Sequence, residues 1–151
     1  MTLATSSLQQ RTLELLQRLA PPSTLPAHLQ TGLAGEQAAL FHLRSLGFTI
    51  VAQRWTTPTV RGDLDLVAWD GPTLVIFEIK TRTARDFAAP ESAVDAPKQR
   101  QLRLLSRAYL RQLPREHRDR VPIRFDLLSV YLLPTGPEFD HFPDAVARTS
   151  D

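Results

Sequence analysis

The run LVIFEIK at residues 74–80 places an acid and a base inside an otherwise apolar segment. Such a run is typical of a central β-strand that is covered on both faces. Because side chains alternate between the two faces of a strand, Glu78 and Lys80 project side by side from its end. Burying such charges is costly unless they are paired, hydrogen-bonded or bound to a metal. The run therefore predicts a covered sheet with a charged site on its central strand.

The segments around this strand predict its neighbours. Leucines at helical spacing predict a helix over Leu33–Leu46, which Gly47 ends. Strand-like runs follow at residues 49–55, 63–69 and 74–81. The turn Asp-Gly-Pro at residues 70–72 predicts that the last two runs form an antiparallel hairpin.

The second half of the chain predicts a further helix and a further strand. Asp95 as a cap and Pro97 in the first turn predict a second long helix, which runs to about Leu113. Residues 123–133 predict a further strand, and the prolines that follow predict an irregular tail. The order of helix, three strands, helix and strand predicts an α/β fold, with a mixed sheet flanked by helices.

We expect one domain, residues 31–147, followed by a short tail at residues 148–151. Residues 1–30 predict an N-terminal helix and a Pro-rich linker, an appendage that packs on the domain or on a protein partner. The chain has no cysteine, no apolar run that could span a bilayer and no signal-peptide pattern. We therefore expect a cytoplasmic protein without disulfides or membrane contact.

More charged side chains fall on inward faces of the predicted elements. In the strand before the hairpin turn, Asp63 and Asp65 share a face with Val67 and Trp69. The other face of that strand is predicted to hold three apolar residues, Leu64, Leu66 and Ala68.

The two helices add an acid and a base. Glu36 falls on the leucine stripe of the first helix, and Lys98 falls on the apolar side of the second. Lys80 and Lys98 are the only lysines of the chain, and both are predicted to face the sheet.

Inward carboxylates beside a lysine are the residues that metal-assisted phosphodiester hydrolysis requires. Carboxylate oxygens suit Mg²⁺ or Mn²⁺, which keep waters for exchange with phosphate oxygens. A bound cation activates a water, and a lysine beside it stabilises the negative charge that develops. The same residues could instead form a structural ion-pair network, and the pattern alone leaves both interpretations open.

One segment of the chain is strongly basic. Residues 98–124 hold nine basic and two acidic side chains, although the whole chain carries a net charge of only +2. On the second helix, four arginines lie opposite the apolar face formed by Leu102, Leu105, Tyr109 and Leu113. These arginines are Arg100, Arg103, Arg107 and Arg111. They predict either a solvated helix face or a surface for nucleic-acid phosphates.

Five motifs in order carry a family resemblance: Gly-Glu at 35–36, RGDLDL at 61–66, FEIKTR at 77–82, Lys98 and RFD at 124–126. Together they resemble the YraN-like family of uncharacterised bacterial proteins over about residues 31–147. That family is similar to Holliday-junction resolvases and other PD-(D/E)XK nucleases. The resemblance implies a restriction-endonuclease-like fold.

The resemblance also implies roles for single residues. Asp65, Glu78 and the backbone carbonyl of Ile79 would hold Mg²⁺ or Mn²⁺, with Lys80 as the catalytic lysine. Glu36 would complete the acidic cluster, and Lys98 would reach the site from the second helix. The family more commonly has Gly-Glu-Ile-Asp where this chain has Gly-Asp-Leu-Asp, so Asp63, one methylene shorter, is not expected to serve the site.

Two functions follow as hypotheses. The first is a divalent-metal-dependent endonuclease that acts on DNA, including branched or recombining DNA, with Arg61, Arg82 and the four helix arginines on phosphates. Related resolvases cut two strands symmetrically, which suggests a homodimer. The alternative is a non-catalytic nucleic-acid-binding module of the same fold within a DNA-processing complex.

Two further sets of residues are placed outside the site. Arg124 and Asp126, two apart on the last predicted strand, are expected to serve structure as a cross-strand ion pair. No histidine is assigned to a site; the four are His28, His42, His117 and His141.

Overall fold

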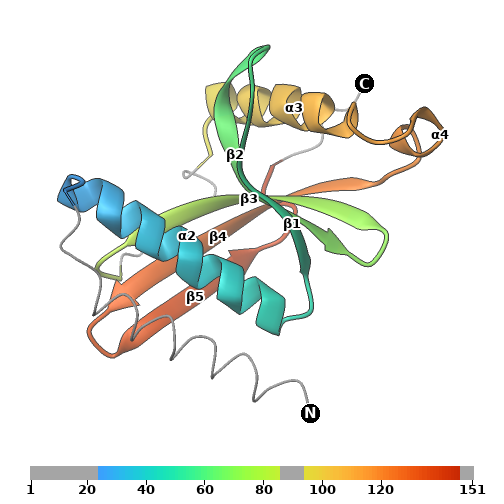
Figure 1. Ribbon diagram of the computed structural model, residues 1–151. Coiled ribbons are helices and arrows are strands. Elements are labelled where there is room, and N and C mark those ends of the chain that lie inside the picture. The colour runs from blue at the N-terminus through green and yellow to red at the C-terminus, as the bar shows by residue number, and fades with distance from the viewer. Residues whose placement is uncertain (1–23, 86–93, 147–151) are drawn as a thin grey trace.

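A five-stranded sheet lies between two long helices in the computed structural model, which describes residues 24–85 and 94–146 (Figure 1). The helices are α2 (Ala27–Ser45), α3 (Ala96–Leu110) and the short α4 (Arg115–Arg118). The strands are β1 (Thr49–Thr57), β2 (Val60–Asp70), β3 (Thr73–Arg82), β4 (Ile123–Leu133) and β5 (Gly136–Phe142). None of the helices within these residues is both long and apolar enough to cross a bilayer.

The sheet is mixed, with its strands in the order β1-β2-β3-β4-β5. Neighbours pair antiparallel except β3 and β4, which run parallel over Leu74–Arg82 and Ile123–Tyr131. Because a parallel pair needs a crossover connection, α3 follows β3 and returns the chain along the sheet. The predicted α/β fold with a mixed sheet is confirmed, and it is consistent with a restriction-endonuclease-like fold.

Each face of the sheet is covered by one helix, as the apolar run of β3 predicts. The core beneath α2 includes Leu40 and Leu43 from the helix and Phe77 from β3. The core beneath α3 includes Leu102 and Leu105 from that helix, packed on residues of β2, β3 and β4. Figure 1 shows α2 crossing in front of the strands, whereas α3 lies beside the upper end of the hairpin formed by β1 and β2.

Local signals in the sequence set several of these elements. The side chain of Asp95 accepts a hydrogen bond from the backbone N–H of Lys98 at 2.9 Å and so caps α3, as expected. The β2–β3 hairpin is also confirmed, with Asp70 paired to Thr73 across a turn in which Gly71 has a φ of 56°. Glycine adopts such a conformation at no steric cost.

Several predicted bounds are wrong. The helix α2 begins at Ala27 rather than Leu33, and α3 ends at Leu110 rather than Leu113. The polar connection after α3 contains the short helix α4. Residues 136–142 form the edge strand β5 rather than an irregular tail, because Pro137 sits where an edge strand tolerates it. The predicted N-terminal helix at residues 5–19 and the tail at 148–151 lie outside the described residues.

The predicted alternation along β2 is wrong at Leu64. Leu64 packs in the core beneath α3, whereas Leu66 and Ala68 pack in the core beneath α2. The cause is a bend at Arg54, which lies opposite Asp65, between the pairs Gln53–Leu66 and Trp55–Leu64. Arg54 has a φ of 45°, which turns both strands of the β1–β2 hairpin together.

Candidate active site

Asp65 lies where β2 separates from β3. The β2–β3 pairing ends at Leu66 and Phe77, and beyond it the Asp65 carboxylate accepts a hydrogen bond from the backbone N–H of Ile79 at 2.8 Å. Burial and the neighbouring charge of Glu78 raise the pKa of Asp65 to about 7, although the Ile79 hydrogen bond and Lys98 oppose the shift. The carboxylates of Asp65 and Glu78 therefore repel each other when both are charged.

Glu78 is held between both lysines of the chain. Its carboxylate is only 5% exposed, with Lys80 Nζ at 3.2 Å from one oxygen and Lys98 Nζ at 3.1 Å from the other. The oxygen that faces Lys98 makes an ion pair but no hydrogen bond among the described residues. The structure thus brings together three predicted site residues from β3 and α3. It also leaves one buried carboxylate oxygen with unused capacity to accept a bond.

Glu36 approaches the same site from α2. The preceding residue, Gly35, is buried against the side chain of Thr81, which draws the helix close to the end of β3. Burial raises the pKa of Glu36; the charge of Arg54 opposes this effect, and the charges of Asp63 and Glu78 add to it. Glu36 is therefore electrostatically part of the acidic cluster, as predicted.

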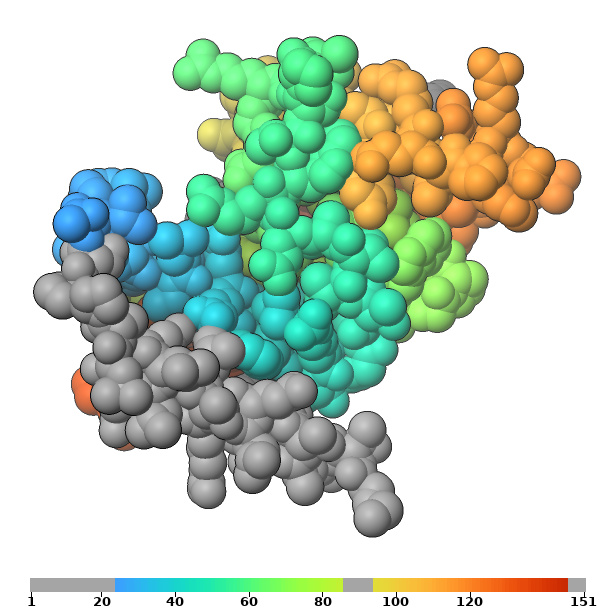
Figure 2. Space-filling view, in the orientation of Figure 1, coloured from blue at the N-terminus to red at the C-terminus, as the bar shows by residue number. Residues whose placement is uncertain are grey.

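The acidic residues line two adjoining cavities. The larger, about 470 Å³, is lined by Glu36, Asp65 and Glu78, together with further residues of α2 and the end of β3. Among its other lining residues are His28, Thr31, Ile79 and Arg82. The smaller cavity, about 370 Å³, lies between α2 and the β1–β2 hairpin and shares Glu36 and Asp65. Figure 2 shows the surface hollowed between α2 and this hairpin.

The donor set fits a hard divalent cation. Asp65 and Glu78 supply carboxylate oxygens, one of them buried without a hydrogen bond, and their mutual repulsion would be relieved by a cation. Within residues 24–85 and 94–146, no three histidine or acidic side chains form a ready-made metal cage. Mg²⁺ does not need one, since it commonly takes one or two carboxylates and completes its shell with water and substrate phosphate. The contact with the Ile79 carbonyl stays a prediction.

The predicted arginines differ in how available they are. Four of them are exposed: Arg61, Arg100, Arg107 and Arg111. Arg82 and Arg103 are half-buried and already take part in interactions, and Arg82 lines the larger cavity. The side chain of Gln101 donates a hydrogen bond to the carbonyl of Arg61 at 2.8 Å, which ties the β1–β2 hairpin to α3. This hydrogen bond places Arg61 beside α3, the helix along which the other exposed arginines of the set lie.

Two titratable residues that line these cavities, His28 and Arg54, were not predicted as site residues from the sequence. His28 lines the larger cavity from the first turn of α2, a turn that the predicted helix start at Leu33 left out. Arg54 lines the smaller cavity, with its Nε 3.8 Å from Glu36 and 4.0 Å from Asp63. No signal in the sequence pointed to Arg54, because its position depends on an unusual backbone conformation.

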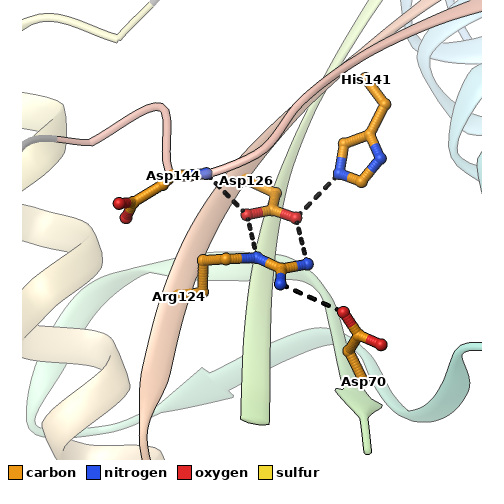
Figure 3. A network of polar contacts seen from close by, with 5 residues as sticks. All are labelled: Asp70, Arg124, Asp126, His141 and Asp144. Carbon is orange, nitrogen blue, oxygen red and sulfur yellow. Dashed lines mark hydrogen bonds and ion pairs between the residues drawn. The ribbon is translucent and has the colours of Figure 1, made fainter.

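A second polar cluster, centred on Asp126, lies apart from this site (Figure 3). The fully buried Asp126 side chain accepts hydrogen bonds from Arg124 at 2.8 and 2.9 Å and from the backbone N–H of Asp144 at 3.0 Å. It also bonds His141 at 2.8 Å, and Arg124 reaches Asp70 at 3.1 Å. The structural role predicted for this pair agrees with these contacts. The predicted cross-strand geometry is wrong: Arg124 and Asp126 both belong to β4, and the cross-strand partners are Asp70 and His141.

Comparison with known proteins places this site in a family. The family model described as "Uncharacterised protein family UPF0102" matches residues 35–130, which include all the predicted acidic and lysine positions. A UPF0102 protein of Koribacter versatilis (strain Ellin345) is 43% identical over 129 residues, 85% of this chain and 87% of that relative. A UPF0102 protein of Solibacter usitatus (strain Ellin6076) is 46% identical over 67% of this chain and 74% of its own length. The chain therefore belongs to the UPF0102 family, the YraN-like family that its motifs resemble.

Proposed function

We propose that this protein is a Mg²⁺- or Mn²⁺-dependent endonuclease that hydrolyses phosphodiester bonds of DNA. The observation that carries the proposal is the environment of Glu78. A nearly buried carboxylate, fixed between two lysines and adjacent to a second carboxylate of raised pKa, borders a cavity of about 470 Å³. Buried carboxylates that serve structure are generally hydrogen-bonded, whereas one oxygen of Glu78 has only its ion pair with Lys98, and an acid of raised pKa beside a cavity is typical of a functional site.

Each residue of the site has a role in this proposal. Asp65 and Glu78, with the Ile79 carbonyl, would hold the cation, and Glu36 would complete the acidic cluster. The bound metal supplies an activated water and offsets charge on the phosphate oxygens. Lys80, whose side chain is 37% exposed, would orient a water or meet the developing negative charge. Lys98, 27% exposed, fixes the second oxygen of Glu78 from α3.

The proposed substrate is a DNA backbone rather than a base sequence. The exposed arginines of α3 and the hairpin offer charge that suits phosphates in any sequence. Through the resemblance to junction resolvases, we extend the proposal to branched or recombination and repair DNA. Cutting both strands of such DNA would use a homodimer, and a DNA substrate agrees with the expected cytoplasmic location.

Cleavage tests the proposal directly. Plasmid, single-stranded, flap and four-way-junction DNA are incubated with Mg²⁺ or Mn²⁺ and wild-type protein, with a chelator as one control. Asp65→Asn and Lys80→Ala should each abolish cleavage, because the first removes a carboxylate of the metal site and the second removes the lysine. Asp119→Asn, the same change at an exposed position after α4, should cut like wild type. Equal cleavage by Asp65→Asn and wild type would contradict the proposal.

Metal binding gives a readout that does not depend on turnover. A cation held by the folded protein raises its melting temperature by mass action. Mn²⁺ should therefore stabilise the wild type and Asp119→Asn but not Asp65→Asn or Glu78→Gln. A folded protein that binds DNA but shows neither metal stabilisation nor cleavage would favour the alternative, a non-catalytic nucleic-acid-binding module.

A further inference from the structure

Arg54 has a backbone conformation that arginine rarely adopts. It lies inside β1 with a φ of 45°, in the left-handed region that glycine and asparagine enter most easily. Within the described residues, Asp144 is the only other non-glycine residue with a positive φ, and it follows the last strand. A residue held in such a conformation inside a strand is often found at a functional site.

The bend directs the Arg54 side chain toward the acidic cluster, but the guanidinium forms no hydrogen bond with Glu36 or Asp63. Its Nε lies 3.8 Å from Glu36 and 4.0 Å from Asp63, distances too long for hydrogen bonds. The side chain remains 58% exposed. By contrast, Arg85 and Arg124 each make hydrogen bonds of 2.6–3.1 Å to carboxylates. The guanidinium of Arg54 therefore keeps its donors available for a ligand.

The available donors border the candidate active site. Arg54 lines the smaller cavity together with Glu36 and Asp65, and these two acids also line the larger cavity. Gln37 and Gln53, two neutral polar residues, line the smaller cavity as well. A chain that passes over the carboxylates from the larger cavity would thus meet the guanidinium of Arg54 next.

We propose that Arg54 binds a backbone phosphate of the nucleic-acid strand, next to the phosphate that a cation held by Asp65 and Glu78 would contact. This inference rests on the proposed function and adds a phosphate-binding residue to it. A guanidinium can bind phosphate with two parallel hydrogen bonds, whereas its contacts with Glu36 and Asp63 are long and exposed.

The test compares substitutions that separate binding from folding. Arg54→Asn removes the charge but suits the left-handed backbone, and Arg54→Lys keeps the charge but loses the planar fork. The matched control is Arg44→Asn, the same change at an exposed position in the last turn of α2. Affinity for a fluorescent four-way junction is measured by anisotropy over a range of salt concentrations, with Ca²⁺ in place of Mg²⁺. Melting temperatures are recorded for every variant.

Arg54→Asn should bind the junction about tenfold more weakly, with a salt slope smaller by about one. Its melting temperature should be at least that of the wild type, since the strain at residue 54 is relieved. Arg54→Lys should recover part of the affinity, and Arg44→Asn should bind like wild type. These results would support the inference.

Three other results would overturn it, and they have different consequences for the proposed function. If the wild type binds and cleaves DNA while Arg54→Asn binds equally well, the Arg54 assignment fails and the nuclease proposal stands. A lowered melting temperature with unchanged affinity would likewise give Arg54 a structural role only. If the wild type neither binds nor cleaves DNA, both the proposed function and this inference fail.

Discussion

Two buried carboxylates of this protein, Asp126 and Glu78, have opposite surroundings. Asp126 accepts hydrogen bonds from Arg124, from His141 and from the backbone of Asp144, so its oxygens are well satisfied. Glu78 has two ammonium groups nearby, yet one of its oxygens has no hydrogen bond in the described part of the chain. Buried polar groups that serve structure are generally satisfied, and exceptions call for an explanation. At the residue scale, this contrast separates a structural cluster from a candidate functional one.

The Asp126 cluster predicts a pH dependence of stability. Burial alone would raise the pKa of Asp126, but hydrogen bonds from His141, Arg124 and the Asp144 backbone outweigh it and lower the pKa. Near pH 4, where an unfolded aspartate titrates, the unfolded chain therefore binds more protons at this position than the folded chain. The stability from Asp126 is present above that pH and is lost as the pH falls through the lowered folded pKa.

We expect Asp126→Asn to lose about 3 kcal/mol of unfolding free energy at pH 7, because it leaves the half-buried Arg124 beside a neutral amide, with the exposed Asp70 as its remaining acidic partner. The measurement is urea denaturation at several pH values. The unfolding free energy of the variant should also fall less as the pH is lowered, because the variant has no Asp126 carboxylate to protonate. Asp144→Asn is the matched control, since Figure 3 shows its carboxylate turned away from Asp126. An unchanged stability in Asp126→Asn would exclude a structural role for the cluster.

At the element scale, the position of Glu36 depends on how closely α2 approaches the sheet. A methyl group added to Gly35 would overlap the Thr81 side chain, whereas one added to Gly32 on the same helix would meet nothing. Gly35 is therefore required by close packing and not by its backbone freedom. The contact sets the distance of Glu36 from Asp65 and Glu78 across the cavity.

Gly35→Ala should destabilise the fold by about 2 kcal/mol, because the helix or Thr81 must move. Gly32→Ala should instead gain about 0.5 kcal/mol, since alanine is the better helix former and has room. Denaturant unfolding of both variants checks this contrast. Cleavage by Gly35→Ala, measured at a temperature where it is folded, should fall as Glu36 shifts. Equal stabilities of the two variants would mean that α2 is not packed as described.

Elements with strong local signals were predicted well from the sequence. The strand β4 has the predicted bounds, and Asp95 caps α3, because apolar runs and caps act over a few residues. The strand β5 was missed because it is an edge strand with polar residues and Pro137, and only its pairing with β4 defines it.

The site was predictable where it follows strand alternation. Glu78, Lys80 and Lys98 come together as their spacing on β3 and α3 indicates. The bend at Arg54 was not predictable, because it requires a left-handed arginine that no sequence rule favours. That bend moved Leu64 to the other face, and it gives the site a residue that the motif does not contain.

For the whole molecule, the acidic residues of the site gather at two cavities, whereas the exposed arginines that the sequence predicts to bind phosphates line neither cavity. The acidic residues line cavities beside α2, whereas the exposed arginines lie along α3 and the hairpin that Gln101 ties to it. A net charge of only +2 means that this separation, not the overall charge, would guide a polyanion to the protein. Binding and cleavage should then be lost through different substitutions.

We therefore expect Arg100→Ala combined with Arg107→Ala to reduce the slope of log affinity against log salt by about two, one unit for each phosphate contact. These two arginines are exposed, whereas Arg103 is half-buried and already engaged. Asp65→Asn should show the opposite pattern, with DNA binding kept and cleavage lost. The control is Arg115→Ala with Arg120→Ala, which removes the same charge from exposed positions at and after α4. If that control flattens the slope equally, overall charge rather than the α3 face governs DNA binding.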